Sequence, residues 1–202
     1  CKTEGHLSWV GKEEIAGAVM ELATFIDAAL KGTLVEANKG KTWLKQIADM
    51  ASETGKNLEW TTPCGFKVVH QYYEILTRRS IATLFDKKEL HFGSPDKETI
   101  DASSVNNAIA PNYVHSLDAS HMWLTIKRMQ EAGINSFSMI HDSYGCAAPD
   151  VNLMRAFTNE EFHSMHLSNL LEDMKSEVEQ KLGVELPPAP DVGAYNIDEV
   201  LE

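Results

Sequence analysis

The spacing of apolar and polar positions predicts a chain that is mainly helical. Apolar residues recur every three or four positions over residues 12–31 and again over 41–54, which is the period of an amphipathic helix. Towards the end of the sequence the same spacing predicts two further helices, at 150–166 and 169–182. No internal repeat connects these segments, so they are expected to pack as separate elements of one fold.

Short strands are predicted between the helices. Residues 58–61 and 66–69 flank a Thr-Pro-Cys-Gly turn, a pattern typical of a β-hairpin. Residues 74–85 fit a strand or a helix equally well. The polar, charged residues that follow, 86–104, surround Gly-Ser-Pro-Asp and indicate an exposed excursion, for which a second hairpin is one option.

A longer helix is predicted in the middle of the chain. Pro111 suits the first turn of a helix, because its missing N–H would be unpaired there in any case. The helix should run from 112 to 132 and end at Gly133. Its apolar residues lie on both sides, which indicates burial over most of its surface. Together these elements predict a mainly helical α+β fold with small antiparallel hairpins.

The most informative motif is Ser-Phe-Ser-Met-Ile-His-Asp-Ser-Tyr-Gly at 136–145. A half-alternating apolar run that ends in His141, Asp142 and a nearby glycine predicts a strand that brings one carboxylate to the tip of a tight hairpin. Such a carboxylate suits Mg²⁺, which takes one or two carboxylates and completes its shell with phosphate and water. The alternative is an ordinary turn aspartate that caps local amides, and the motif alone favours it.

Two chemical readings of this motif can be compared. A hydrolase triad from His141, Asp142 and Ser143 is disfavoured, because adjacent strand residues point to opposite faces. Nucleotidyl transfer fits better, but it needs two carboxylates to hold a pair of cations about 4 Å apart. The sequence offers one obvious candidate, so the second is expected outside this chain.

His115 and Asp118 are three residues apart and should share a helix face. The carboxylate could fix the tautomer of a histidine that hydrogen-bonds a sugar hydroxyl. A buried histidine satisfied by a neighbouring acid is the simpler explanation and is favoured by the spacing alone. His121, three residues beyond Asp118, is an alternative partner for it.

Charge and cysteine content narrow the possible functions. The chain has 202 residues and a formal net charge of −12, with five Lys and Arg against sixteen Asp and Glu in residues 101–202. This argues against independent DNA binding but not against membership of a larger assembly.

Three separated cysteines indicate a reducing compartment without a zinc or disulfide framework. A start at Cys1 and the absence of a long apolar run lead us to expect an intracellular fragment without a membrane partner.

Four blocks occur in order along the second half of the chain. They are Ala-Pro-Asn-Tyr-Val-His-Ser-Leu-Asp-Ala-Ser-His-Met at 110–122, His-Asp-Ser-Tyr-Gly at 141–145, Glu-Phe-His-Ser-Met-His at 161–166 and Pro-Asp-Val-Gly-Ala-Tyr-Asn-Ile-Asp at 190–198. This order resembles the C-terminal part of the single-subunit DNA-dependent RNA polymerases of bacteriophages and mitochondria. A weaker, collinear similarity covers Trp60-Thr-Thr-Pro-Cys-Gly-Phe. Tyr144-Gly145 is more typical of the phage members.

The resemblance implies a right-hand polymerase fold, with residues 1–109 in the fingers region and 110–202 in the palm. It implies that Asp142 is the second catalytic aspartate and binds Mg²⁺. His141 would then lie near the RNA 3′ end, and His115 near the ribose of the incoming nucleotide. The excursion at 86–99 matches a promoter-reading hairpin, which makes weak DNA-contact candidates of the basic residues Lys87, Lys88, His91 and Lys97.

The same resemblance implies partners and limits. The partners are a DNA template, the RNA product, ribonucleoside triphosphates, and the rest of the polymerase chain or a subunit with the other catalytic aspartate. That aspartate and the nucleotide-binding fingers helix have no counterpart here, so these residues alone are expected to be inactive. Cytoplasmic location in an infected cell is expected for a phage enzyme, with the mitochondrial matrix as the alternative. A family A DNA polymerase and a non-catalytic helical subunit of a split polymerase are the alternative functions.

Overall fold

The computed structural model describes residues 15–82, 89–191 and 193–201, with the backbone alone for 76–82, 89–95, 97 and 98. Five α-helices and three two-stranded antiparallel sheets are present in these ranges, which confirms the predicted mainly helical α+β class. The chain divides into two compact units, Cys1–Thr42 and Trp43–Glu202, and each is described by itself.

The first unit contributes one complete helix. Helix α1 spans Ile15–Thr33 and corresponds to the predicted helix at 12–31, whose first three residues lie outside the described range. None of its residues is buried. Helix α2, Val35–Glu53, begins six residues before the predicted start and passes from the first unit into the second.

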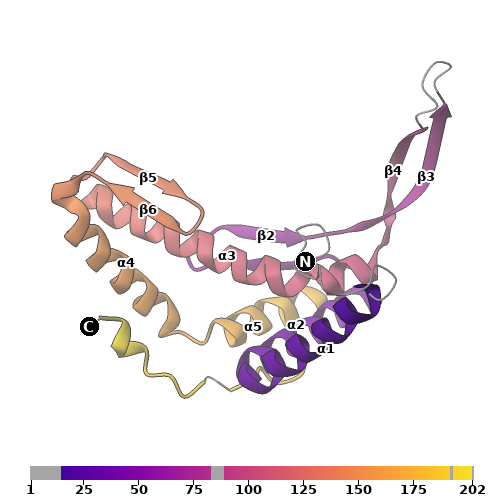
Figure 1. The fold of residues 1–202 in the computed structure, drawn as a ribbon, viewed down its shortest axis with the longest axis horizontal. Helices are drawn as coiled ribbons and strands as arrows, with labels where there is room; N and C mark the ends of the chain where they lie inside the picture. Colours follow the sequence, from indigo (N-terminus) through magenta and orange to yellow (C-terminus); the bar gives the residue numbers. More distant parts are fainter. Residues whose placement is uncertain (1–14, 83–88, 192, 202) are drawn as a thin grey trace. The chain divides into compact units, whose positions relative to one another are not determined.

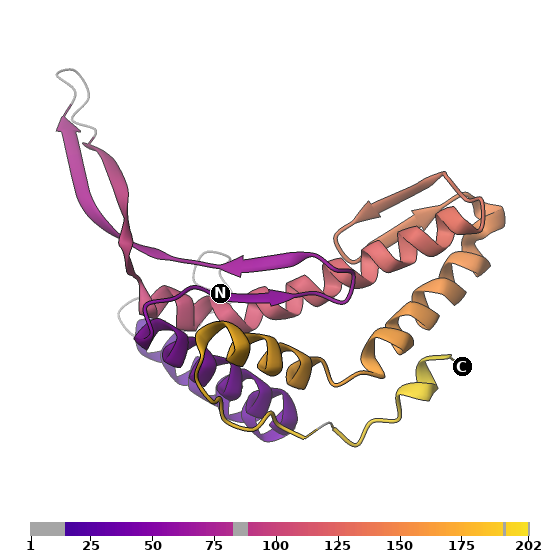
Figure 2. The ribbon, with the colours of Figure 1, turned by 180° about the vertical axis from the view of Figure 1, so that it is seen from behind.

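The second unit is built along one long helix, α3, which spans Ala102–Glu131. The first hairpin, β1 (Leu58–Thr61) and β2 (Lys67–His70), lies beside α3, and helix α5 (Leu170–Leu182) packs against β1 (Figures 1 and 2). The strands pair as predicted, from Leu58 opposite His70 to Thr61 opposite Lys67.

A large hydrophobic core joins this hairpin to the helices around it. Trp60, Ile47 and Ile109 are almost completely buried and come from β1, α2 and the first half of α3. The indole N–H of Trp60 donates to Ser116 Oγ at 3.0 Å, so its polar atom is satisfied inside the core. This core holds the N-terminal half of α3 in place.

The ambiguous segment at 74–85 contains a strand. Strand β3, Tyr73–Ala82, pairs antiparallel with β4, Glu89–Ile100, with register shifts near Ile75. Within the charged excursion, Glu89–Ile100 is therefore one arm of a long hairpin, which projects from the N-terminal end of α3 (Figure 1).

Helix α3 starts ten residues before the predicted start at 112, so that prediction was wrong. Asp101 provides the start signal, because its carboxylate accepts hydrogen bonds from Ser104 N at 3.0 Å and Ser104 Oγ at 2.6 Å. Pro111 lies inside the helix and not in its first turn. It removes one backbone donor there, a loss that a 30-residue helix packed against the core can tolerate.

The C-terminal half of α3 is followed by the motif hairpin and a second helix. Strands β5 (Phe137–Ile140) and β6 (Ser143–Cys146) form the hairpin, and a short 3₁₀ turn, η1 (Ala148–Asp150), leads into α4 (Val151–His166). After α5 comes the 3₁₀ turn η2, Ile197–Leu201, which packs on α4.

The expected boundary at 109/110 between fingers and palm regions falls within α3, and the assignment of these regions stays a prediction. Within the described ranges, none of the helices combines the length and apolar character needed to cross a lipid bilayer.

Candidate catalytic site

The motif hairpin places Asp142 where the sequence predicts it, at a tight turn. Ile140 pairs with Ser143, so His141 and Asp142 are the two residues of the connection. His141 has a φ of 54°, and it is the non-glycine residue with positive φ in the described part of the chain. A two-residue hairpin needs a positive φ in this turn, and glycine adopts it at the lowest cost. The turn therefore carries local backbone strain next to the carboxylate.

The hairpin is anchored through one face. Phe137, Met139, Tyr144 and Cys146 are half-buried, whereas the residues between them are exposed. The half-buried side chains pack on a small cluster formed by Met129, Ile134 and Met154 from α3, the following loop and α4. The alternation follows from the strand period of two. It leaves the turn itself, with Asp142, at the surface.

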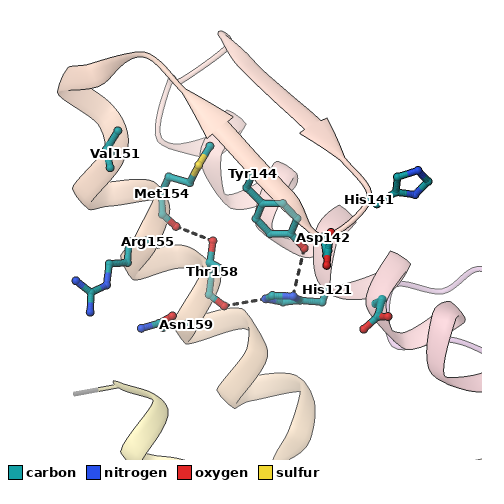
Figure 3. Close-up of a pocket in the computed structure, with 10 residues that line it drawn as sticks. His121, His141, Asp142, Tyr144, Val151, Met154, Arg155, Thr158 and Asn159 are labelled. Carbon is teal, nitrogen blue, oxygen red and sulfur yellow. Dashed lines mark hydrogen bonds between the residues drawn. The ribbon is translucent and has the colours of Figure 1, made fainter. Parts of the chain in front are cut away.

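Asp142 shares two pockets with a second carboxylate, that of Asp118 on α3. One pocket, of about 370 Å³, lies between α3, the hairpin tip and α4 and also includes Tyr144 and Arg155 (Figure 3). The other, of about 780 Å³, extends along α3 past His115 and Met122. Asp118 could not be joined to Asp142 from the sequence, because 24 positions separate them. They come together because the hairpin returns along α3.

The electrostatics of Tyr144 agree with this arrangement. Burial raises the pKa of the Tyr144 phenol, and the negative charges of Asp118 and Asp142 raise it further. Among the described residues, none donates a hydrogen bond to either carboxylate, and both are exposed. An ordinary turn aspartate would cap nearby amides. The Asp142 carboxylate instead lines a pocket without such a bond, which suits a cation ligand.

The two predicted site histidines differ in position. His141 and Asp142 line both pockets, but in Figure 3 the His141 ring points away from Tyr144 and His121. His115 is exposed on α3 and lines the larger pocket. No hydrogen bond joins His115 to Asp118; both side chains are exposed and line that pocket. The simpler explanation, a buried and satisfied His115, is also wrong.

His121 bonds to groups that the sequence did not reveal. Its Nε2 lies 2.8 Å from Thr158 O on α4, and its Nδ1 lies 3.3 Å from the Tyr144 hydroxyl on β6. The suggested pairing with Asp118 is thus not observed. A backbone carbonyl on another helix leaves no trace in the spacing of side chains, so this partner could not be found from the sequence.

The residues at the hairpin tip fit a hard divalent cation. The exposed carboxylates of Asp142 and Asp118 line one pocket, and Mg²⁺ commonly takes one or two carboxylates when phosphate and water complete its shell. A closed all-protein cage is absent from the described residues, since they contain no group of three or more His, Cys, Asp or Glu placed to hold a metal. The site would therefore depend on further ligands.

The predicted DNA-contact residues belong to the charged excursion, of which the structure describes only a part. Lys87 and Lys88 fall outside the described residues. His91 and Lys97 lie on strand β4, for which only the backbone is described at these positions. Their contact with DNA stays a prediction.

Comparison with known proteins gives the class to which this fold and site belong. The sequence profile of DNA-dependent RNA polymerases matches residues 3–200, which is nearly the whole chain. The chain therefore belongs to the family of DNA-dependent RNA polymerases of the single-subunit type.

Particular relatives are plant enzymes, and two of the three named here are organellar by name. DNA-directed RNA polymerase 3, chloroplastic, of Nicotiana sylvestris is 31% identical over 185 residues, which is 89% of this chain and 18% of the relative. DNA-directed RNA polymerase 1, mitochondrial, of the same plant is 32% identical over 85% of the chain and 17% of its own length. DNA-directed RNA polymerase 2A of Nicotiana tabacum is 31% identical over 94% of the chain and 56% of its own length.

The chain spans less than a fifth of the length of the first two relatives. Their names place them in chloroplasts and mitochondria and give no support to the expected cytoplasmic location. The phage-like reading of Tyr144-Gly145 stays a prediction.

Proposed function

We propose that this chain is the part of a DNA-dependent RNA polymerase that supplies one metal-binding carboxylate, Asp142, for addition of ribonucleotides to an RNA 3′ end on a DNA template. Membership of the family and the exposed position of Asp142 at a hairpin tip support this role. The pocket that Asp142 shares with Asp118 is the observation that carries it, because it concentrates negative charge where a cation would bind.

In this proposal each residue has a distinct task. The Asp142 carboxylate holds Mg²⁺, and Asp118 adds negative charge to the same pocket. When bound, the cation stabilises the charge that develops on the phosphoryl oxygens during nucleotidyl transfer. His141 faces the RNA 3′ end, and His115, in the larger pocket, contacts the ribose of the incoming nucleotide. The basic residues of the long hairpin contact DNA.

The remaining ligands come from the rest of the polymerase, in the same chain or in a second subunit. That part brings the other catalytic aspartate and the nucleotide-binding helix of the fingers. The mitochondrial name of one relative is compatible with a mitochondrial matrix location.

The test is reconstitution of RNA synthesis. The chain is mixed with an N-terminal polymerase fragment that carries the missing aspartate and is known to be competent, and Mg²⁺-dependent extension of a primed template is followed. Asp142→Asn should lower the extension rate by several orders of magnitude, because a metal-clamping oxygen is lost. Asp118→Asn should raise the Mg²⁺ concentration needed for half-maximal rate severalfold and change the maximal rate less.

Asp150→Asn is the matched control. It removes the same charge at the start of α4, where the Asp150 side chain makes no cap hydrogen bond. Extension should be unchanged in this variant. Equal extension by the wild type and Asp142→Asn would contradict the proposal. The chain would then be assigned to the alternative, a non-catalytic subunit.

A further inference from the structure

The hairpin that carries Asp142 has few anchors. Its outward residues are exposed, including Ile140, which is 65% exposed, and its half-buried face rests on a cluster with only three buried side chains. Packing alone leaves such a hairpin free to shift, because local stability follows the number of buried apolar contacts. A catalytic carboxylate needs tighter placement than this, within about 0.5 Å of its working position.

A directional hydrogen-bond chain supplements the packing. The carbonyl of Thr158 can only accept, so His121 Nε2 carries the hydrogen and donates to it at 2.8 Å. In the neutral ring His121 Nδ1 is then an acceptor, and the Tyr144 hydroxyl donates to it at 3.3 Å. The bonds therefore run from β6 through α3 to α4, as the dashed lines in Figure 3 show.

The His121 ring is itself held by its surroundings. The ring of Phe162 meets it edge-on, with centroids 5.5 Å apart and an interplanar angle of 80°. Phe162 in turn stacks on His166, at 4.1 Å between centroids. Aromatic contacts of this kind restrict ring rotation. The ring can therefore transmit the position of α4 to the Tyr144 hydroxyl.

The geometry assigns to His121 and Tyr144 the role of positioning residues, which fix the Asp142 hairpin relative to the Asp118 carboxylate. Tyr144 lies two residues after Asp142 on β6, and His121 lies three residues, about one helical turn, after Asp118 on α3. The single bond between Tyr144 and His121 thus ties the two acidic residues together. This inference rests on the proposed polymerase function, and neither side chain touches the reacting atoms.

Three variants separate the hydrogen bonds from the packing. Tyr144→Phe removes only the hydroxyl, and His121→Leu removes both ring nitrogens. His121→Gln keeps one donor for Thr158 O and one acceptor for Tyr144, so it should restore most of the effect. The control is Tyr113→Phe, which removes a hydroxyl that donates to Leu170 O at 2.9 Å in the large core, away from the hairpin.

The first measurement is amide hydrogen exchange of residues 137–146 in the complete chain, which needs no catalytic activity. Tyr144→Phe and His121→Leu should exchange about two- to tenfold faster there, as the loss of one hydrogen bond predicts. His121→Gln should remain close to the wild type, and Tyr113→Phe should leave these amides unchanged. Unchanged exchange in both Tyr144→Phe and His121→Leu overturns the inference.

The second measurement is the extension rate in the reconstituted polymerase. Misplacement of Asp142 should lower kcat about ten- to a hundredfold and leave the KM for nucleotide within about twofold. If the variants show faster hydrogen exchange in the hairpin but an unchanged kcat, the Tyr144–His121 bond is purely structural and the positioning role is overturned. If the wild type fails to extend RNA with a competent partner, the proposed function fails, and the positioning role with it, while hydrogen exchange still decides whether the bond holds the hairpin.

Discussion

The two halves of α3 lie in contrasting environments. The N-terminal half contributes Val105, Ile109 and Tyr113 to a cluster of fourteen buried residues, whereas the C-terminal half contributes one, Met129, to a cluster of three. Buried apolar area is the main stabilising term in folding, so the first cluster supports the unit and the second supports only the hairpin and α4. The helix thus connects a stable scaffold to an open site.

Polar groups differ between the two regions in the same way. Beside the large core His70 is buried and paired: its Nε2 lies 3.0 Å from Val105 O, and the half-buried Asn112 donates to both His70 Nδ1 and the Tyr72 hydroxyl. At the hairpin end Asp142 and Asp118 are exposed and, among the described residues, accept no hydrogen bond. Unpaired polar groups cost little at the surface and remain available for a ligand.

Matched isoleucine deletions should give the largest difference between the regions. Ile47 is fully buried in the large core, and Ile47→Ala should lower the free energy of unfolding by about 2–5 kcal/mol, because a cavity replaces the packed side chain. Ile140 is 65% exposed on the hairpin, and Ile140→Ala should lower the free energy of unfolding by no more than about 0.5 kcal/mol. Urea unfolding of the two variants measures both values. Comparable losses would show that the hairpin end is as strongly packed as the core.

The contrast also explains what the sequence could predict. The tip position of Asp142 follows from a local alternation that ends in a turn signal, and the structure confirms it. The predicted start of α3 was wrong, because Pro111 was interpreted as the start signal whereas Asp101 caps the helix. The Asp118–Asp142 pocket and the His121 bonds depend on how the hairpin folds back on α3 and α4, which no spacing within a single element encodes.

His70 should make the stability of the scaffold depend on pH. Burial lowers the pKa of His70 below its usual 6.5, and the hydrogen bond with Val105 only partly opposes this. The unfolded chain therefore binds the proton more readily, and the folded state loses stability as pH falls from 6.5 towards the lower folded pKa. Protonation at Nδ1 would also break the bond from Asn112.

His70→Gln is the variant that tests this dependence, because its amide can donate to Val105 O and accept from Asn112 but does not titrate. The urea midpoint of the wild type should fall between about pH 7.5 and about pH 5.5. That of the variant should fall less. The carboxyls of Glu59 and Glu177, whose pKa values lie below 4.5, lose their contribution only in more acidic solution. Parallel midpoints for the two proteins would exclude His70 as the titrating group.

The smallest effect on stability should come from a substitution in the hairpin turn. This turn can be compared directly with the end of α5, where the backbone also has a positive φ. At the end of α5 the chain adopts a φ of 75° with glycine, Gly183, whereas at the hairpin tip it adopts 54° with His141. A residue with a side chain costs roughly 1–2 kcal/mol in this left-handed region, so a change to glycine removes that cost. Glycine also makes the unfolded chain more flexible, which offsets about 0.5–1 kcal/mol of the stabilisation. His141→Gly should therefore stabilise the fold by about 0.5 kcal/mol.

His141→Ala is the control for this prediction, because it removes the imidazole and keeps the backbone cost, so it should give no stabilisation in urea unfolding. Equal stabilisation by alanine and glycine would mean that the ring, and not the backbone, is the source of strain. A gain in stability with glycine alone, accompanied by slower RNA extension, would show that the hairpin retains a strained residue for the sake of its imidazole. Such a trade of stability for activity is expected at a functional site and has no counterpart in the glycine at the end of α5.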